Sequence, residues 1–408
     1  MLISNDIIPV KQLEYYKKEL QNELSAILNF WQQNTIDTAF GGFYGKLDNS
    51  NKVFHDAPKG SVLNSRILWA FSSAYNLTGN KEYLNTAKRA FRYITDYFVD
   101  KINGGVYWTV NYKGEPLDTK KQIYALSFAI YGLSEFYLAS KNQQAKEAAI
   151  ELYHLIVEHS YDIINGGYIE ALSADWKEIN DLRLSKKDAN EKKSMNTHLH
   201  VLEGFANLYR IWPDEVLKNK IDELIHIFLN HIIDKNTNHL ILFFDEKWNA
   251  KSNIISYGHD IEAAWLMQEA AEIINDSELI ERVKLKSVQL ANAVTEGLDK
   301  DGGLWYEYDE NKNHLIKEKH SWLQAESMIG FFNAWQLTGN ESSLKKSLNS
   351  WKFVKEHILD KKNGEWFWGV KENYDLMNED KVGIWKCPYH NSRACIELIK
   401  RINNTFLN

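Results

Sequence analysis

Apolar residues recur at helical spacing along most of the chain. In 63–77 and 82–98 they stand at i, i+3, i+4 and i+7, so each stretch predicts an amphipathic helix. The same pattern brings the predicted helices to twelve, the others being 10–33, 121–138, 142–159, 196–211, 214–232, 257–274, 277–298, 320–337, 341–358 and 389–405. Within each pair one helix is richer in small and apolar residues and the other in charged residues. This asymmetry indicates an inner and an outer ring.

A glycine–aromatic marker recurs between the helix pairs. It reads GGFYG at Gly41, GGVYW at Gly104, GGYIE at Gly166, GGLWYE at Gly302 and GEWFW at Gly364. The gaps are 63, 62, 136 and 62 residues, and the gap of 136 is about twice the others. A sixth marker is therefore expected near residue 239, where HLILFF follows Asn236-Thr237-Asn238. The chain divides into six units of roughly 60–70 residues, and the markers predict short strands or turns near the barrel mouth.

Six helical hairpins that close on themselves form an (α/α)6 barrel, the fold we predict. An open solenoid is the alternative, but it needs terminal units with a polar outer face, and neither end shows that asymmetry. We find no linker and no low-complexity tract, so we assign residues 1–408 to a single domain.

Composition narrows the classes of function. The net charge of -7 and pI of about 6.0 argue against a nucleic-acid partner. No window approaches 18 uninterrupted apolar residues, so we expect no membrane span. The 2 cysteines do not make a disulfide framework, which favours a reduced, cytoplasmic setting. Aromatic residues make up 13% of the chain, and such rings also stack on sugars. We expect a small-molecule partner and a monomer.

Polar and aromatic residues mark the starts of the predicted inner helices. They are Arg66, Tyr124, His198, His200, His259, Trp322 and His390. From His200 onward the steps are 59, 63 and 68 residues, close to the repeat length. Equivalent points of successive repeats lie at one depth, so these side chains should converge on one pocket.

Two of the histidines have a carboxylate three residues later. His200 precedes Glu203, and His259 precedes Glu262. Residues at i and i+3 share a helix face. A carboxylate there can accept a ring N–H and fix the tautomer and orientation of the imidazole. The spacing predicts such a bond for both histidines.

Other interpretations of these residues stay open. Each histidine alone could be a structural, hydrogen-bonded group, and this is how we interpret His154, His159, His231, His314 and His320. His200, His259 and His390 could instead bind zinc, whereas His198 and His200 point about 200° apart and are not expected to share an ion. A glycoside hydrolase would need paired carboxylates, for which Asp188, Glu262 and Glu326 are candidates. Phosphate-binding glycine loops and a GxSxG elbow are absent from the sequence.

Motifs across nearly the whole chain resemble the cellobiose 2-epimerase branch of the N-acylglucosamine 2-epimerase superfamily. They are KGSVLNSRILWAF (59–71), KDANEKKSMNTHLHVLE (187–203), YGHDIEAAWL (257–266), WLQAESMIGFFNAWQ (322–336) and WKCPYHNSRACIE (385–397). The resemblance implies an (α/α)6 barrel that reversibly inverts C2 of a reducing-end glucose or mannose unit. It implies no metal and no cofactor.

The resemblance also implies roles for individual residues. His259 and His390 match the two acid/base residues and His200 the third histidine of the site. Arg66 and Glu262 match groups that hold the sugar hydroxyls and O1. The stacking platforms and further sugar contacts are matched by Trp322, Trp385, Asp188 and Asn196. Two positions depart from the family pattern: Ser321 stands where many members have Trp, and Leu126 where many have Gln.

We therefore expect epimerisation of β-1,4-linked disaccharides such as cellobiose, lactose or mannobiose. A mannose 2-epimerase acting on the free monosaccharide is the nearest alternative. A glycoside hydrolase and a non-catalytic sugar-binding protein are alternatives of other classes. Both departures bear on the preference for disaccharides more than on the chemistry.

Overall fold

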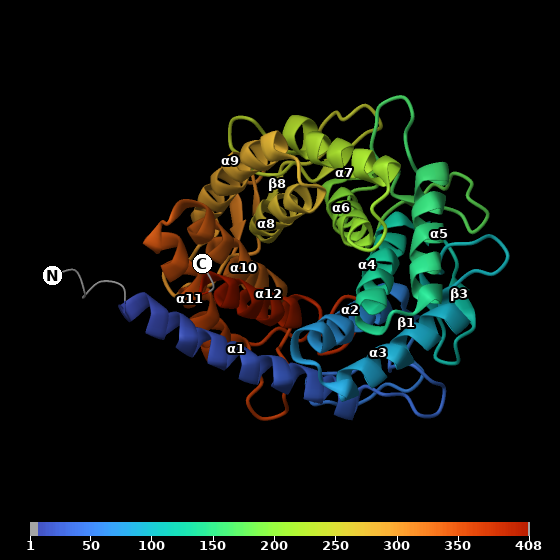
Figure 1. Cartoon of the computed structure of the whole chain (residues 1–408), viewed down its shortest axis with the longest axis horizontal. Helices are drawn as coiled ribbons and strands as arrows, with labels where there is room; N and C mark the ends of the chain where they lie inside the picture. The colour runs from blue at the N-terminus through green and yellow to red at the C-terminus, as the bar shows by residue number, and fades with distance from the viewer. Residues whose placement is uncertain (1–6, 407–408) are drawn as a thin grey trace.

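The computed structural model describes residues 7–406, and helices alternate between two concentric rings (Figure 1). The inner ring consists of α2 (Ser61–Thr78), α4 (Ile123–Ser140), α6 (Met195–Tyr209), α8 (Tyr257–Ile274), α10 (Ser321–Thr338) and α12 (His390–Thr405). The outer ring consists of α1 (Ile7–Asn34), α3 (Lys81–Tyr93), α5 (Gln143–His159), α7 (Glu215–Ile227), α9 (Ser277–Ala293) and α11 (Glu341–Phe353). Each inner helix packs against the next, and α12 packs against α2 and α1. The ring is closed, which confirms the predicted (α/α)6 barrel and excludes the open solenoid.

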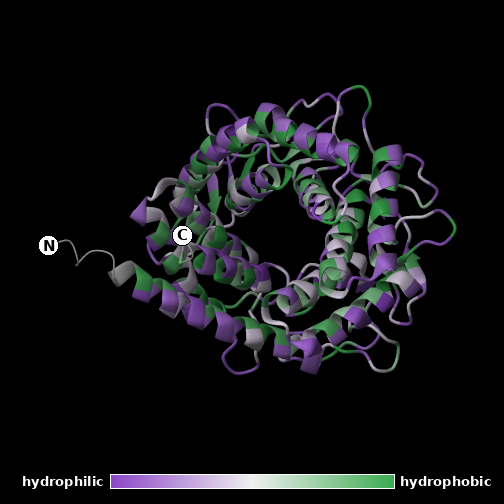
Figure 2. Cartoon of the chain, viewed as in Figure 1, coloured by the Kyte–Doolittle hydropathy of each residue, from purple (hydrophilic) through white to green (hydrophobic). Residues whose placement is uncertain are grey.

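Hydrophobicity explains which helix lies in which ring. Residues 123–136 of α4 are all buried, as expected for a helix that is apolar on nearly every face. Outer helices are amphipathic, with hydrophilic residues facing outward (Figure 2). Each outer helix from α3 onward begins after an Asn or Asp whose side chain accepts a backbone N–H of the first turn. These residues are Asn80, Asn142, Asp214, Asp276 and Asn340.

Short turns extend several helices beyond their α-helical bounds. Three outer helices end in a π-helical turn: η1 (Ile94–Phe98), η2 (Phe228–Ile232) and η4 (Val354–Ile358). A 3-10 turn, η3 (Val294–Gly297), ends α9. No helix within residues 7–406 is both long enough and apolar enough to cross a membrane.

The repeat markers form six equivalent turns between an outer and an inner helix. Each turn closes with one antiparallel bridge: Ile36–Phe43, Val99–Val106, Tyr161–Tyr168, Ile233–Leu240, Leu298–Leu304 and Leu359–Trp366. The bridge at Leu240 confirms the marker expected near residue 239. There Asn238, with φ of 60°, takes the left-handed position that glycine fills elsewhere.

Short antiparallel strands line the same end of the barrel. They are β1 (Lys59–Gly60), β2 (Thr109–Val110), β3 (Pro116–Asp118), β4 (Lys121–Gln122), β5 (Ala171–Leu172), β6 (Lys193–Ser194), β7 (Phe243–Phe244), β8 (Ile254–Ser256), β9 (Glu307–Asp309), β10 (His314–Ile316), β11 (Lys319–His320) and β12 (Gly369–Val370). Strands β1, β4, β6, β8 and β11 each lead directly into an inner helix. They thereby fix where each inner helix begins at the barrel mouth.

Lysine–aspartate pairs, each with a buried lysine, tie five of the six turns to the barrel wall. The pairs are Lys59–Asp37 (2.7 Å), Lys121–Asp100 (2.7 Å), Lys193–Asp162 (2.9 Å), Lys319–Asp299 (2.7 Å) and Lys381–Asp360 (2.6 Å). Burial alone would raise the pKa of Asp162, but its lysine and backbone donors outweigh burial and lower the pKa to about 2. In the remaining unit Ile255 stands where the lysine would be. There His239 Nδ1 lies 2.7 Å from Asp260 Oδ2 instead.

The first of these turns gives a test of how tightly the repeat is built. Gly42 has a φ of 61°, and a Cβ atom there would lie 2.6 Å from Tyr93 Cγ. Gly79, the C-cap of α2, has a φ of 70°, but an added Cβ would meet no atom within 4 Å. We expect Gly42→Ala to cost about 3 kcal/mol and Gly79→Ala about 1 kcal/mol, because only the first adds a clash to the left-handed strain. Calorimetric thermal midpoints at one scan rate measure both, and equal losses would contradict the clash.

Candidate active site

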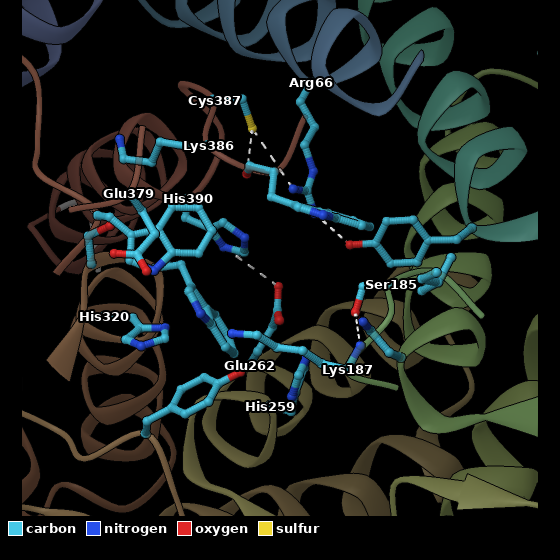
Figure 3. Close-up of a pocket in the computed structure, with 18 of the residues that line it drawn as sticks. Arg66, Ser185, Lys187, His259, Glu262, His320, Glu379, Lys386, Cys387 and His390 are labelled. Carbon is cyan, nitrogen blue, oxygen red and sulfur yellow. Dashed lines mark hydrogen bonds and ion pairs between the residues drawn. The ribbon is translucent and has the colours of Figure 1, made fainter. Parts of the chain in front are cut away.

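A cavity of about 520 Å³ opens where the inner helices begin. All nine residues predicted from the sequence line it: Arg66, Asp188, Asn196, His200, His259, Glu262, Trp322, Trp385 and His390. In Figure 3, His259 and His390 lie near Glu262, and Arg66 enters from the opposite side of the view. The residues predicted from repeat spacing and those predicted from the family resemblance thus line the same cavity. Their chemical roles stay proposals.

His390, the first residue of α12, is held by a buried carboxylate. Its Nδ1 lies 2.6 Å from Glu326 Oε1, and Glu326 also accepts hydrogen bonds from Trp265 Nε1 (3.0 Å) and Arg393 Nη2 (2.7 Å). With such donors around it, the carboxylate is the acceptor and His390 Nδ1 the donor. This leaves Nε2 as the unprotonated nitrogen. Burial lowers the pKa of His390 well below its ordinary value, so the ring is neutral near pH 7.

His200 is held in the same way from its own helix. Its Nδ1 lies 2.8 Å from Glu203 Oε2, which confirms the bond predicted from the i, i+3 spacing. Burial alone would raise the pKa of Glu203, but Arg393 and His200 lower it to about 2. The carboxylate is therefore ionised and fixes the tautomer of His200.

His259 has a different partner from the one predicted. Its Nδ1 lies 2.8 Å from Ser256 Oγ, not against Glu262, so the prediction from spacing was wrong here. Glu262 instead accepts a hydrogen bond from Arg393 Nη2 (2.5 Å), which draws its carboxylate away. Burial lowers the pKa of His259 to about 4. Because a serine hydroxyl can donate or accept, this ring is not restricted to one tautomer.

Arg393 joins the carboxylates behind the histidines. It is fully buried and donates to Glu203, Glu262 and Glu326, which lie on three consecutive inner helices. It also lies against Tyr389, whose hydroxyl donates to Glu203 Oε1 (2.5 Å). One guanidinium thereby supplies the positive charge for three buried carboxylates.

Arg66 has no carboxylate partner among the hydrogen bonds of the described residues. Its Nη2 donates to Tyr124 Oη (2.8 Å), and its guanidinium lies over the rings of Phe128 (4.1 Å) and Tyr389 (4.6 Å). Its side chain is only 3% exposed. The structure therefore presents a buried positive charge at the cavity that a ligand oxygen can neutralise.

Two tryptophans provide flat walls. The Trp322 ring lies 4.9 Å from the His259 ring and 5.5 Å from the His390 ring, measured between centroids, so it contacts both histidines. Trp385 lies 5.7 Å from Trp108 and 5.9 Å from Tyr124. Aromatic faces of this kind can pack on the C–H surface of a sugar ring.

Polar groups of the 185–196 segment complete the wall. Asp188 accepts the backbone N–H of Ser185 (2.8 Å), and burial raises its pKa. Asn196 Oδ1 is buried without a hydrogen-bond partner within residues 7–406. An unpaired buried acceptor facing a cavity is suited to a ligand hydroxyl.

Several residues that line the cavity were not predicted from the sequence. His320, interpreted above as structural, stacks on Tyr306 at 4.1 Å and bonds Glu318 through Nε2 (2.9 Å). Lys187, Trp368 and Glu379 also line the cavity. His320 ends β11 directly before Ser321 and Trp322, and this adjacency was the available signal.

His198 lies outside the cavity lining, so the prediction that it converges on the pocket with the other residues was wrong. Its ring points away from that of His200, because alternate residues of a helix lie about 200° apart. Its Nε2 accepts the backbone N–H of Tyr168 (2.9 Å), and its Nδ1 lies 2.6 Å from the Ser194 carbonyl. Burial lowers its pKa to about 4. His198 is thus a neutral structural group that fixes one repeat turn.

The alternative zinc site made of His200, His259 and His390 does not form. Within residues 7–406 the one set of at least three potential ligand groups spaced for a metal is Glu262, Glu326 and His390. The Arg393 guanidinium already bonds both of these carboxylates, so its charge takes the place of a cation.

Leu126 and Ser321, the two departures from the family pattern, lie in different places. Leu126 is fully buried and is not among the cavity-lining residues, whereas Ser321 lines the cavity. Only the change at Ser321 alters the wall directly.

Barrel and cavity together define a carbohydrate epimerase, an isomerase, as comparison with known proteins shows. The family model of N-acylglucosamine 2-epimerase (GlcNAc 2-epimerase) matches residues 42–394, and the chain belongs to this family. It is 48% identical to a cellobiose 2-epimerase of Bacteroides fragilis, over 95% of this chain and 99% of that protein. It is 39% identical to a cellobiose 2-epimerase of Dictyoglomus turgidum, over 96% and 100%. The solved cellobiose 2-epimerase of Bacillus thermoamylovorans superposes with a TM-score of 0.91 at 38% identity, covering 95% of this chain and 100% of that chain.

The shared guanidinium predicts a pH-dependent loss of stability. Arg393→Met would leave three buried carboxylates without their cation, at a cost of about 3–5 kcal/mol near pH 7. Burial raises the pKa of Glu203 and Glu326 and Arg393 opposes that rise, so without the guanidinium the folded state would bind more protons. The deficit in thermal midpoint should therefore shrink as the pH falls from 8 to 5.

Arg66→Met is the matched control, because this buried arginine bonds a tyrosine hydroxyl and not a carboxylate. Its deficit should change much less with pH. Parallel pH dependence in the two variants would show that the three carboxylates do not depend on Arg393.

Proposed function

We propose that this protein epimerises the reducing-end glucose or mannose unit of β-1,4-linked disaccharides at C2, with His259 and His390 exchanging the proton. The observation that carries the proposal is the pair of histidines in contact with one tryptophan ring. Each is held through Nδ1, by Ser256 and by Glu326, and so presents Nε2 as its reactive nitrogen. Inversion of one carbon needs two such groups.

The chemistry follows from the residue types. The C2 proton is acidic only when C1 is an open-chain aldehyde. One histidine takes this proton at Nε2, and the C2–H electron pair forms a cis-enediolate. The other histidine returns a proton to the opposite face of C2, and the aldehyde re-forms. Neither oxidant nor reductant is consumed, so the scheme requires no metal and no cofactor.

The enediolate oxygen needs a positive partner. Arg66 supplies this positive charge from the far side of the cavity. Among the described residues, no carboxylate accepts a hydrogen bond from its guanidinium. A preorganised donor of this kind contributes about 3 kcal/mol or more to the transition state. His200 and Glu262 bind O1 and the neighbouring hydroxyls of the same sugar unit. Glu203 holds His200 in place for this contact.

The two histidines hold the exchanged proton in different ways. The His390 ring donates Nδ1–H to a carboxylate, so Nε2 is a ready base, and Glu326 stabilises the imidazolium that forms. His259 can switch tautomer, because the Ser256 hydroxyl accepts from or donates to Nδ1. This ring can therefore carry a proton at Nε2 without carrying a net charge.

The relatives support a disaccharide substrate. The two curated relatives described above are cellobiose 2-epimerases, and a cavity of about 520 Å³ lies within the range of sites that enclose ligands of this size. Of the three carboxylates considered for hydrolysis, Glu326 does not line the cavity, and both Glu326 and Glu262 are bonded to Arg393. Asp188 is then the one candidate not held by this guanidinium, which disfavours a hydrolytic carboxylate pair. The free monosaccharide mannose is the competing substrate.

Proton NMR of cellobiose, lactose and mannose in D2O tests the proposal with metal-free protein. We expect loss of the C2 proton signal and appearance of the epimer, faster with a disaccharide. His259→Asn and His390→Asn should each slow this by about 10²–10⁴-fold. His198→Asn, at a buried histidine outside the cavity, should keep its turnover per folded molecule.

Faster turnover of mannose would assign the monosaccharide instead. Release of glucose from cellobiose would assign a hydrolase. Binding of sugars without any exchange at C2 would assign a non-catalytic protein.

Ser256 gives a separate test of the tautomer switch. Ser256→Ala removes the only hydrogen-bond partner of His259 Nδ1 among the described residues, and we expect about 10-fold slower turnover. Ser252→Ala, at a serine that accepts only the Ile254 N–H, is the control and should not change the rate. Unchanged turnover in both variants would mean that His259 does not need this hydroxyl.

A further inference from the structure

The sixth repeat turn has a glutamate at a left-handed position where the first three turns have glycine. In the first three turns the second left-handed residue is glycine: Gly42, Gly105 and Gly167. In the sixth turn this residue is Glu365, with a φ of 65°. A side chain in this conformation is strained, and such strain persists where the surrounding structure requires the residue.

Every oxygen of the Glu365 carboxylate is engaged. Its Oε2 accepts from Trp31 Nε1 (2.6 Å). Its Oε1 accepts from Lys386 Nζ (2.8 Å), Asn391 Nδ2 (2.5 Å) and the Trp366 backbone N–H (3.0 Å). The side chain is 0% exposed. The carboxylate is thus a buried anion with four donors.

Two of the three side-chain donors flank the reacting histidine in the sequence. Lys386 and Asn391 stand at the ends of the 386–391 segment, which contains Cys387 and His390, and both line the cavity. Helix α12 begins at His390 with no side-chain cap on its first turn. Glu365 itself does not line the cavity. Glu365 therefore affects the cavity by holding the 386–391 segment and not by contacting the ligand.

The repeat does not need this contact. The turn already has its own buried pair, Asp360 with Lys381 (2.6 Å), like four of the other turns. The Glu365–Lys386 pair is additional, and it joins the sixth turn to the start of α12. Its negative charge also lies near the N-terminal end of that helix, where the helix dipole favours an anion.

We propose that Glu365 is a positioning residue, which holds the 386–391 segment so that His390 meets C2 of the sugar. This inference rests on the proposed function of His390. The strained backbone at Glu365 is then retained because the carboxylate of this residue fixes the position of His390. A glycine would relieve the strain and release the segment.

Glu365→Gln and Glu365→Gly test the inference, with Asp360→Asn as the matched control. Asp360 is a buried carboxylate of the same turn that pairs with a lysine but does not contact the 386–391 segment. We expect kcat for C2 exchange to fall about 10- to 100-fold in the Glu365 variants, because small displacements of a reacting group cost this much. KM should change by less than about threefold, and glycine should have the larger effect on kcat.

Stability separates this role from a merely structural one. Asp360→Asn should lower the thermal midpoint without lowering kcat, whereas Glu365→Gly should lower kcat even where its midpoint is close to that of the parent protein. Retained kcat in the Glu365 variants, or an equal loss of kcat in Asp360→Asn, would overturn the proposal.

A second readout does not depend on turnover. Cys387 lies in the held segment and is 4% exposed, and Cys395 is fully buried. Release of the segment should raise the rate at which iodoacetamide alkylates Cys387 roughly threefold or more in the Glu365 variants and not in Asp360→Asn. If the parent protein epimerises no sugar, the proposed function fails, and an unchanged alkylation rate would separately refute the positioning role.

Discussion

The guanidinium of Arg393 is the interaction on which the cavity wall depends. It bonds Glu203, Glu262 and Glu326 from α6, α8 and α10, while Arg393 itself belongs to α12. Leaving these three buried carboxylates without their cation would cost about 3–5 kcal/mol in total. Four of the six inner helices are therefore fixed relative to one another by one side chain.

This arrangement gives the site two layers. The histidines lie at the mouth, and the charged residues follow three positions later in α6, α8 and α12, about one helical turn deeper. In the deeper layer Glu262 lines the cavity, whereas Glu203 and Arg393 do not. Glu203 and the neighbouring Glu326 are partly neutralised by Arg393 and hold the imidazole rings of His200 and His390 in one orientation. The upper layer keeps the free nitrogens and the unpaired charge of Arg66 for a sugar.

The sequence predicted most of the fold because both helix and repeat periods are local properties of the chain. The helices, their ring assignment and the sixth marker near residue 239 are confirmed. Arg66, His200, His259, Trp322 and His390 share one cavity because repeat spacing sets their depth, whereas Asp188, Asn196 and Trp385 were predicted as sugar contacts from the family resemblance alone. The bond from His259 to Ser256 was not predicted, since a backward contact to the preceding strand competes with the helical i, i+3 pair. The role of Arg393 depends on contacts 67 to 190 residues apart, which periodicity does not encode.

Closure of the ring through α12 has a consequence for biosynthesis. The inner helix α12 carries both His390 and Arg393 and packs against α1, which lies more than 350 residues earlier in the chain. During translation the first five hairpin units thus expose an open seam and three acidic side chains awaiting their counterion. Until residues 390–405 have been synthesised, the preceding units can acquire neither the closed ring nor the full reactive centre, so a chain truncated before α12 should leave its ribosome with an open edge.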